Sequence, residues 1–113
     1  MKKILAISLA ALVAATAAQA EGELKLYNWF EYMPQELLDK FTAETGITVT
    51  MDTYDSNEAL LASLKAGRLG SYDIAVPGDY MVKILGDEGM LGTFTPDEIP
   101  NFGNIEEQWV NVP

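Results

Sequence analysis

The sequence predicts an α/β protein with a parallel β-sheet, its elements following the order β-α-β-α-β-α. Two observations support this class. Three short apolar or β-branched stretches, each suited to a strand, alternate with amphipathic stretches of roughly ten residues that suit helices. Proline and glycine lie where these stretches meet. Because a helix intervenes between successive strands, right-handed crossovers should bring the strands together in parallel.

The first strand and the first helix are predicted from the spacing of apolar residues. Residues 23–28 alternate, and Leu24 and Leu26 fall on one face of the expected strand. Pro34 should open the helix, since proline suits a first helical turn, and Gly46 should end it. The apolar stripe of this helix consists of Leu37, Leu38 and Phe41.

The second strand is predicted at an edge of the sheet. Residues 47–53 are rich in β-branched residues and alternate, as expected for a strand that is not covered on both faces. Asp55 and Glu58 have the spacing of a capping box, so the next helix should begin there, and Gly67 is placed to end it. The buried face of this helix consists of Leu60, Leu61 and Leu64.

The third strand should be the most buried of the three. Residues 72–76 contain an apolar run without alternation, which is typical of strands covered on both faces. A third helix should follow Pro77 and Gly78, with Asp79 as a candidate cap. Its apolar residues are Met81, Val82, Ile84 and Leu85.

The remainder of the chain is less regular. We expect a short extended piece at residues 91–94 and a further helix start at residues 95–98, ended by Pro100. Residues 101–113 have no clear periodicity.

The first twenty residues are expected to be a secretion signal and not part of the fold. Lys2 and Lys3 give a positive start, residues 4–18 form an apolar, alanine-rich run, and residues 18–20 place small side chains where a signal peptidase reads them. The run is shorter than the roughly 20 residues that span a membrane, which argues against an N-terminal anchor. We therefore expect cleavage after Ala20 and no membrane insertion of the mature chain.

The composition excludes several classes of chemistry. The chain has 17 acidic and 7 basic side chains and no histidine or cysteine. This excludes a Ser-His-Asp or Cys-His nucleophile, a zinc site of imidazole or thiolate ligands, and a disulfide framework. Loss of the two signal lysines would change the net charge from −10 by two units to −12, so nucleic acid is a poor partner. No dinucleotide, phosphate-loop or calcium-loop motif is present, and we expect no cofactor and no metal.

A ligand site is predicted at the carboxyl ends of the strands, where open parallel sheets bind their ligands. The turns there are residues 29–32, 54–57 and 77–80, and each carries an aromatic residue beside a carboxylate. Ring faces attract cations by roughly 0.5–2 kcal/mol when water is excluded, and carboxylates add charge-assisted hydrogen bonds. We therefore expect an organic cation with an aliphatic body.

These residues also have purely structural interpretations. Asp55 and Asp79 lie where helix N-caps are expected, and helix N-termini favour anions, so the cation argument depends on carboxylates that are not used in capping. Trp29 could belong to the core, and Tyr54 is expected to pack under the second helix. An acid–base pair such as Glu31 and Asp79 would need a fixed separation and a nucleophile or oxyanion site, which the sequence does not supply, so we expect no enzymatic activity.

Four motifs occur in an order that is specific as a set. They are YNW-x-x-Y in the first turn, ETGI-x-V before the second strand, DSNE at the second helix start and YD-x-x-VP around the third strand. From Leu24 to its end, the chain closely resembles the start of bacterial periplasmic polyamine-binding proteins. These are the spermidine/putrescine solute-binding components of ABC transporters.

The resemblance implies the first part of a two-lobed, type II-like α/β fold whose lobes close on a ligand and deliver it to membrane permease subunits. It implies a periplasmic protein in which Trp29 and Tyr32 pack along the methylene chain of a polyamine and Glu31 reaches an ammonium group. Gly78 or Tyr80 should also touch the ligand. With their neighbours in the two turns, the expected ligand-binding residues are Trp29, Phe30, Glu31, Tyr32, Gly78, Asp79 and Tyr80.

The chain departs from the resemblance in two respects. Phe30 and Gly78 stand where relatives commonly carry a small hydroxyl residue, so two hydroxyl groups are lost. Such proteins are also much longer. We therefore expect residues 1–20 to be a cleaved signal and residues 21–113 to be the N-terminal portion of lobe 1, without the second lobe.

Two other functions stay open at this point. The protein could bind a different organic cation, such as a quaternary amine, through the same aromatic and acidic turns. Alternatively, residues 21–113 could form a small secreted interaction domain that uses its acidic surface to bind a basic partner.

Overall fold

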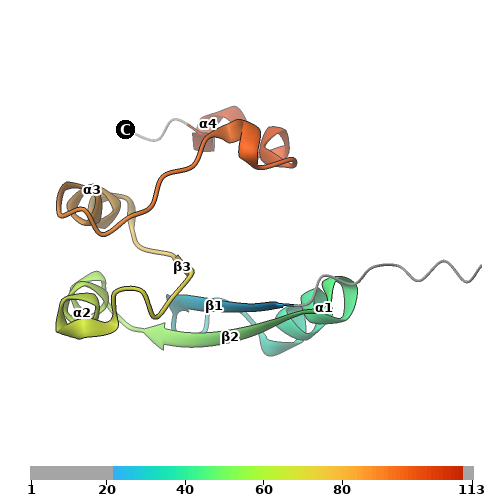
Figure 1. Ribbon diagram of the computed structural model, residues 1–113, viewed down its shortest axis with the longest axis horizontal. Coiled ribbons are helices and arrows are strands. Elements are labelled where there is room, and N and C mark those ends of the chain that lie inside the picture. The colour runs from blue at the N-terminus through green and yellow to red at the C-terminus, as the bar shows by residue number, and fades with distance from the viewer. Residues whose placement is uncertain (1–21, 111–113) are drawn as a thin grey trace, which may run out of the picture.

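The computed structural model describes residues 22–110, which form an α/β unit around a three-stranded parallel sheet (Figure 1). The strand order is β2-β1-β3, with β1 at Gly22–Trp29, β2 at Ile47–Tyr54 and β3 at Ile74–Ala75. Each strand is followed by a helix: α1 at Gln35–Thr45, α2 at Asn57–Ser63 and α3 at Asp79–Asp87. The predicted fold class and element order are confirmed. The expected signal, residues 1–20, lies outside the described residues.

The central strand is β1. It pairs with β2 along its whole length, from Gly22 opposite Ile47 to Trp29 opposite Tyr54. On its other side it pairs with β3 at only two positions, and the three consecutive residues 26–28 are buried. The alternating strand β2 lies at an edge of this sheet, as predicted.

The prediction for the third strand is wrong in its burial. The strand covers only Ile74–Ala75 within the expected range 72–76, and it lies at the opposite edge of the sheet instead of between two neighbours. Ile74 and Val76 are 47% and 39% exposed. The physical reason is that Ile74 and Val76 line the open apolar groove beside α1, which no other part of residues 22–110 fills, whereas Ala75 packs against the main core.

The helix α1 begins and ends where proline and glycine predicted. Pro34 occupies the N-cap position, and Gly46 takes the left-handed conformation, with φ at 76°, that ends the helix. Of the predicted stripe, however, only Leu38 is buried. Leu37 and Phe41 are exposed and border an apolar groove of about 580 Å³ between α1 and the sheet, together with Leu24, Leu26, Val49 and Val76.

The main core lies on the opposite face of the sheet, under α2 and α3. In Figure 1, α2 lies beside the arrowhead of β2. The predicted buried faces of both helices are largely confirmed, although Val82 is exposed. The buried cluster consists of Tyr27, Tyr54, Leu60, Leu64, Met81 and Leu85.

Two predicted helix caps are wrong. Ser56, not Asp55, caps α2, because the helix begins one residue later and the Ser56 hydroxyl accepts a hydrogen bond from the Ala59 amide at 3.1 Å. In α3 the N-cap position belongs to Gly78, and Asp79 lies inside the first turn, where its carboxylate accepts from the Tyr80 amide at 2.7 Å. Neither aspartate therefore acts as the N-cap residue of its helix.

The segments after α2 and α3 follow glycine and proline signals. A π-helical turn at Leu64–Arg68 extends α2 and ends through Gly67, whose φ is 104°. The extended piece expected at residues 91–94 has no regular secondary structure. The helix start predicted at residues 95–98 is a 3₁₀ turn at Pro96–Glu98, where the Glu98 carboxylate accepts a hydrogen bond from the Thr95 amide at 2.6 Å.

The last described segment contains two short helices that the sequence pattern did not predict. They are a 3₁₀ turn at Phe102–Asn104 and α4 at Glu107–Val110. No helix in residues 22–110 combines the length and the apolar character needed to cross a bilayer.

Replacement of Leu60 by alanine should lower the free energy of unfolding by about 2–5 kcal/mol, because Leu60 is fully buried in the main core and its loss leaves a cavity. Urea denaturation of the purified protein measures this change. Leu37→Ala is the matched control: Leu37 is half exposed, and the loss should stay below about 1 kcal/mol. Equal losses for the two variants would contradict the placement of the core.

Candidate functional site

The carboxyl ends of the strands bring the three predicted turns together. The Phe30 amide donates to the Tyr54 carbonyl at 2.9 Å, which joins the first turn to the second. The Gly78 amide donates to the Asn57 side chain at 2.9 Å, which joins the third turn to the second. Residues 29–32, 54–57 and 77–80 therefore form one rim, as the parallel topology predicts.

The first turn presents its aromatic residues in different environments. The Trp29 ring is partly buried, with its centroid 4.9 Å from the Tyr54 ring and 5.9 Å from the Tyr32 ring. The side chains of Phe30 and Tyr32 are exposed. Trp29 thus belongs in part to the core, as its structural interpretation held, and in part to the rim.

Glu31 has an unusual backbone conformation. Its φ is 59°, and it is the one residue other than glycine in residues 22–110 with a positive φ. This left-handed conformation costs a residue other than glycine roughly 1–2 kcal/mol, because its Cβ atom lies close to the following carbonyl oxygen. The turn therefore holds Glu31 in a defined place, with its side chain exposed to solvent.

A polar connection holds the third turn against α2. Asn57 is buried, and its side-chain oxygen accepts the Gly78 amide. A Cβ atom at position 78 would lie 2.9 Å from the Asn57 amide nitrogen, so glycine allows this close contact without a shift of the Asn57 side chain. Two residues further on, the Tyr80 hydroxyl donates to the Glu58 carboxylate at 2.9 Å.

Tyr54 connects the second turn to Val76, the residue just before the third turn. It packs under α2 as predicted, and its hydroxyl donates to the Val76 carbonyl. Burial raises the pKa of Tyr54 to about 12. The phenol therefore keeps its proton, and this hydrogen bond, throughout the neutral pH range.

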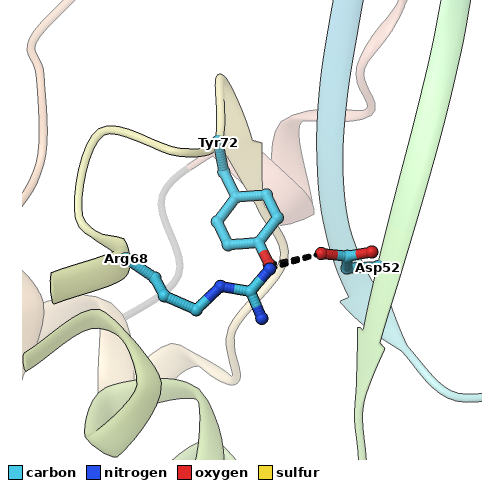
Figure 2. A network of polar contacts seen from close by, with 3 residues as sticks. All are labelled: Asp52, Arg68 and Tyr72. Carbon is cyan, nitrogen blue, oxygen red and sulfur yellow. Dashed lines mark hydrogen bonds and ion pairs between the residues drawn. The ribbon is translucent and has the colours of Figure 1, made fainter. Parts of the chain in front are cut away.

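A second polar network holds the chain just before β3 and is shown in Figure 2. One oxygen of Asp52 accepts from both Arg68 and the Tyr72 hydroxyl, each at 2.6 Å. The Tyr72 ring stacks on Tyr27 with 4.2 Å between centroids and 11° between planes, and the Arg68 guanidinium lies 5.0 Å from the Tyr72 ring centre. The hydrogen bonds from Tyr72 and then Arg68 lower the pKa of Asp52 below its ordinary value of 3.8.

The hollows of the surface coincide only partly with the predicted residues. A cavity of about 430 Å³ lies between the first and second turns, and Phe30 is the one predicted ligand residue in its lining, beside Asp55 and Tyr54. The larger apolar groove near α1 contains none of the predicted ligand residues. Among residues 22–110, no three acidic side chains gather closely enough to hold a metal ion.

Comparison with known protein families gives one match over residues 36–109, to the family described as bacterial extracellular solute-binding protein. The chain belongs to this family. The resemblance on which the sequence prediction was based is therefore confirmed at the level of the family.

Individual relatives of this solute-binding protein are named for polyamines. The spermidine/putrescine-binding periplasmic protein of Escherichia coli (strain K12) is 41% identical over 106 residues, which are 94% of this chain and 30% of the relative. The putrescine-binding periplasmic protein SpuD of Pseudomonas aeruginosa (strain UCBPP-PA14) is 40% identical over 112 residues, 98% of this chain and 30% of the relative. The chain thus spans about 30% of the length of these curated relatives, which are named as binding proteins and not as enzymes.

Solved structures give the same relationship. The spermidine/putrescine ABC transporter substrate-binding protein PotD of Streptococcus pneumoniae matches with a TM-score of 0.72 and 40% identity, over 80% of this chain and 28% of that one. A putative spermidine/putrescine ABC transporter protein of Listeria monocytogenes matches with a TM-score of 0.70 and 36% identity, over 77% of this chain and 27% of that one. The α/β arrangement of this solute-binding protein is therefore the one found in these structures.

The Asp52 network should make stability depend on pH in the acid range. Because the pKa of Asp52 is lower in the folded state, its stabilising contribution is present above its unfolded pKa and is lost as the pH falls through the folded pKa. Asp52→Asn should therefore lower the urea midpoint at about pH 7 and leave it nearly unchanged at about pH 2. Asp97→Asn, an exposed aspartate outside the network, is the control. A constant difference between Asp52→Asn and the unmodified protein at both pH values would contradict this role.

Proposed function

We propose that this protein, in its complete form, binds a polyamine such as putrescine or spermidine in the periplasm and delivers it to an ABC-type importer. The observation that carries the proposal is the rim itself. The first and third turns place exposed aromatic side chains on one edge of the sheet, all three turns carry exposed carboxylates there, and the backbone amides of Phe30 and Gly78 are used in internal hydrogen bonds. The names of the relatives support the same ligand class.

The chemistry of a polyamine matches this rim. Its methylene chain can pack against the faces of Trp29 and Tyr32, whose centroids lie 5.9 Å apart. Its ammonium groups are attracted by ring faces and donate charge-assisted hydrogen bonds to carboxylates, for which Glu31 is well placed on the same turn. The net charge of −10 also attracts a polycation over longer distances.

The proposed ligand-binding residues lie on the first and third turns. We assign the aromatic contacts to the rings, the ammonium contacts to the carboxylates, and the close approach of the backbone to glycine. The residues are Trp29, Phe30, Glu31, Tyr32, Gly78, Asp79 and Tyr80.

We further propose that residues 1–20 are a cleaved signal and that residues 21–113 correspond to the N-terminal part of one lobe. The share of about 30% that the chain covers in its relatives supports this division. The apolar groove beside α1 supports it too, because a groove lined by Leu37, Phe41 and Val76 is a surface that further chain could cover. The second lobe would then provide the other wall of the binding cleft and the contact with the permease.

A second ligand class has one observation in its favour. A putrescine/agmatine-binding protein of Pseudomonas aeruginosa is 35% identical over 112 residues. Agmatine carries a guanidinium in place of one ammonium, and planar cations also stack on aromatic rings. Competition between agmatine and putrescine therefore belongs in the binding experiment.

Trp29→Ala should weaken putrescine or spermidine binding by more than about 1 kcal/mol, roughly fivefold or more, because it removes a large aromatic contact from the rim. Isothermal titration calorimetry on the protein expressed from the complete gene measures this loss. Trp109→Ala is the matched control, since Trp109 is an exposed tryptophan on α4, away from the rim. Absence of heat with every polyamine, in folded protein, would overturn the proposed function.

A further inference from the structure

Glu58 makes a contact that the ligand prediction does not use. It lies in the first turn of α2, and its Oε1 atom accepts a hydrogen bond from the Tyr80 hydroxyl at 2.9 Å, across 22 residues of sequence. Tyr80 itself lies in the first turn of α3 and is 52% exposed. The phenol is therefore open to the rim while its proton points toward a carboxylate of another helix.

The preceding residue of α2, Asn57, holds the same turn through its backbone. Asn57 is buried, and its side-chain oxygen accepts the Gly78 amide at 2.9 Å. The Asn57 carboxamide lies so close that a Cβ atom at position 78 would approach its nitrogen to 2.9 Å. Two consecutive side chains of α2 thus hold the turn after β3, one through its backbone and one through Tyr80.

The direction of the Tyr80 hydrogen bond decides what the phenol can offer a ligand. A phenol has one proton and two lone pairs. Since the proton is donated to Glu58, the oxygen can only accept, and the negative carboxylate behind it strengthens it as an acceptor. An alkylammonium group has donors only and suits this oxygen. A ligand group that offers an acceptor to the phenol would have to compete with Glu58 for its proton.

We propose that Glu58 is a specificity-determining residue that acts through Tyr80: it reserves the Tyr80 oxygen as an acceptor and places a negative charge directly behind it. The site thereby favours a second ammonium group over a hydroxyl group at the same position of the ligand. This inference rests on the proposed function, because it assumes an organic amine at this rim. Glu58 is a positioning residue and need not touch the ligand.

The test compares two ligands of equal length on four forms of the complete protein and one control variant, Glu107→Gln. Putrescine carries an ammonium at both ends, and 4-aminobutan-1-ol replaces one ammonium by a hydroxyl. The forms are the unmodified protein, Glu58→Gln, Tyr80→Phe and the double variant, each measured by calorimetry. Glutamine keeps the length of the side chain, but its neutral amide accepts more weakly and can itself donate to the phenol oxygen.

Glu58→Gln should weaken putrescine binding about three- to tenfold and should lower the ratio of putrescine to aminobutanol affinity by a similar factor, as expected for loss of one charge-assisted hydrogen bond. In the Tyr80→Phe background the same change should have an effect below about twofold, because the coupling runs through the phenol. Glu107→Gln, which removes one exposed carboxylate on α4, should change neither value. If Glu58→Gln does not fold, Tyr80→Phe alone should still lower the ratio.

Three results would overturn the inference. The first is an unchanged affinity ratio in Glu58→Gln, the second an equal loss with and without the Tyr80 hydroxyl, and the third an equal loss in Glu107→Gln, which would indicate net charge alone. These results are distinct from failure of the proposed function, in which the unmodified protein would bind neither amine.

Discussion

The pairing of β1 with a parallel strand on each side is the constraint on which the rest of this structure depends. It places Tyr27 in the middle of the sheet. There its ring stacks on the Tyr72 ring and makes a T-shaped contact with the Tyr54 ring, with 4.8 Å between the centroids of Tyr27 and Tyr54. The Tyr27 carbonyl accepts a hydrogen bond from the Val76 amide at 3.1 Å, so the end of β3 is held against the same residue. Because all three strands point the same way, their ends, and the turns that carry the aromatic and acidic residues, are aligned at one edge.

Several hydrogen-bond donors of the rim are used within the protein, and the rings of Phe30 and Tyr32 are exposed beside carboxylates. The Phe30 amide, the Gly78 amide and the Tyr54 hydroxyl all donate to groups of a neighbouring turn or strand. Donors that are already bonded are not offered to an anion, whereas ring faces and carboxylate oxygens attract cations. The electrostatic preference of the site therefore follows from how the three turns are tied to one another.

Local sequence signals were sufficient for the elements that local chemistry controls. Pro34 and Gly46 set the ends of α1, and the alternation of residues 47–53 identified β2 as an edge strand. The same reasoning failed for β3. An apolar run shows that a strand is suited to burial, but it does not show whether another part of residues 22–110 covers the strand. It also placed the cap of α2 at Asp55, one residue before Ser56.

The side chains that organise the rim could not be found from spacing. Asn57 reaches Gly78 across 21 residues, and Asp52 reaches Tyr72 across 20. These contacts arise from the crossover that returns the chain beside β1, and no local period encodes them. The DSNE motif did mark the right place, although the sequence identified it only as a helix start.

The fit between Gly78 and Asn57 has a consequence for how closely the chain can pack at this point. A Cβ atom at position 78 would lie 2.9 Å from the Asn57 amide nitrogen, so any other residue there requires the Asn57 carboxamide or the turn to shift. The same carboxamide accepts the Gly78 amide through its oxygen, so such a shift acts directly on the hydrogen bond that ties the third turn to α2. The size of the residue at position 78 therefore sets the spacing between the third turn and α2.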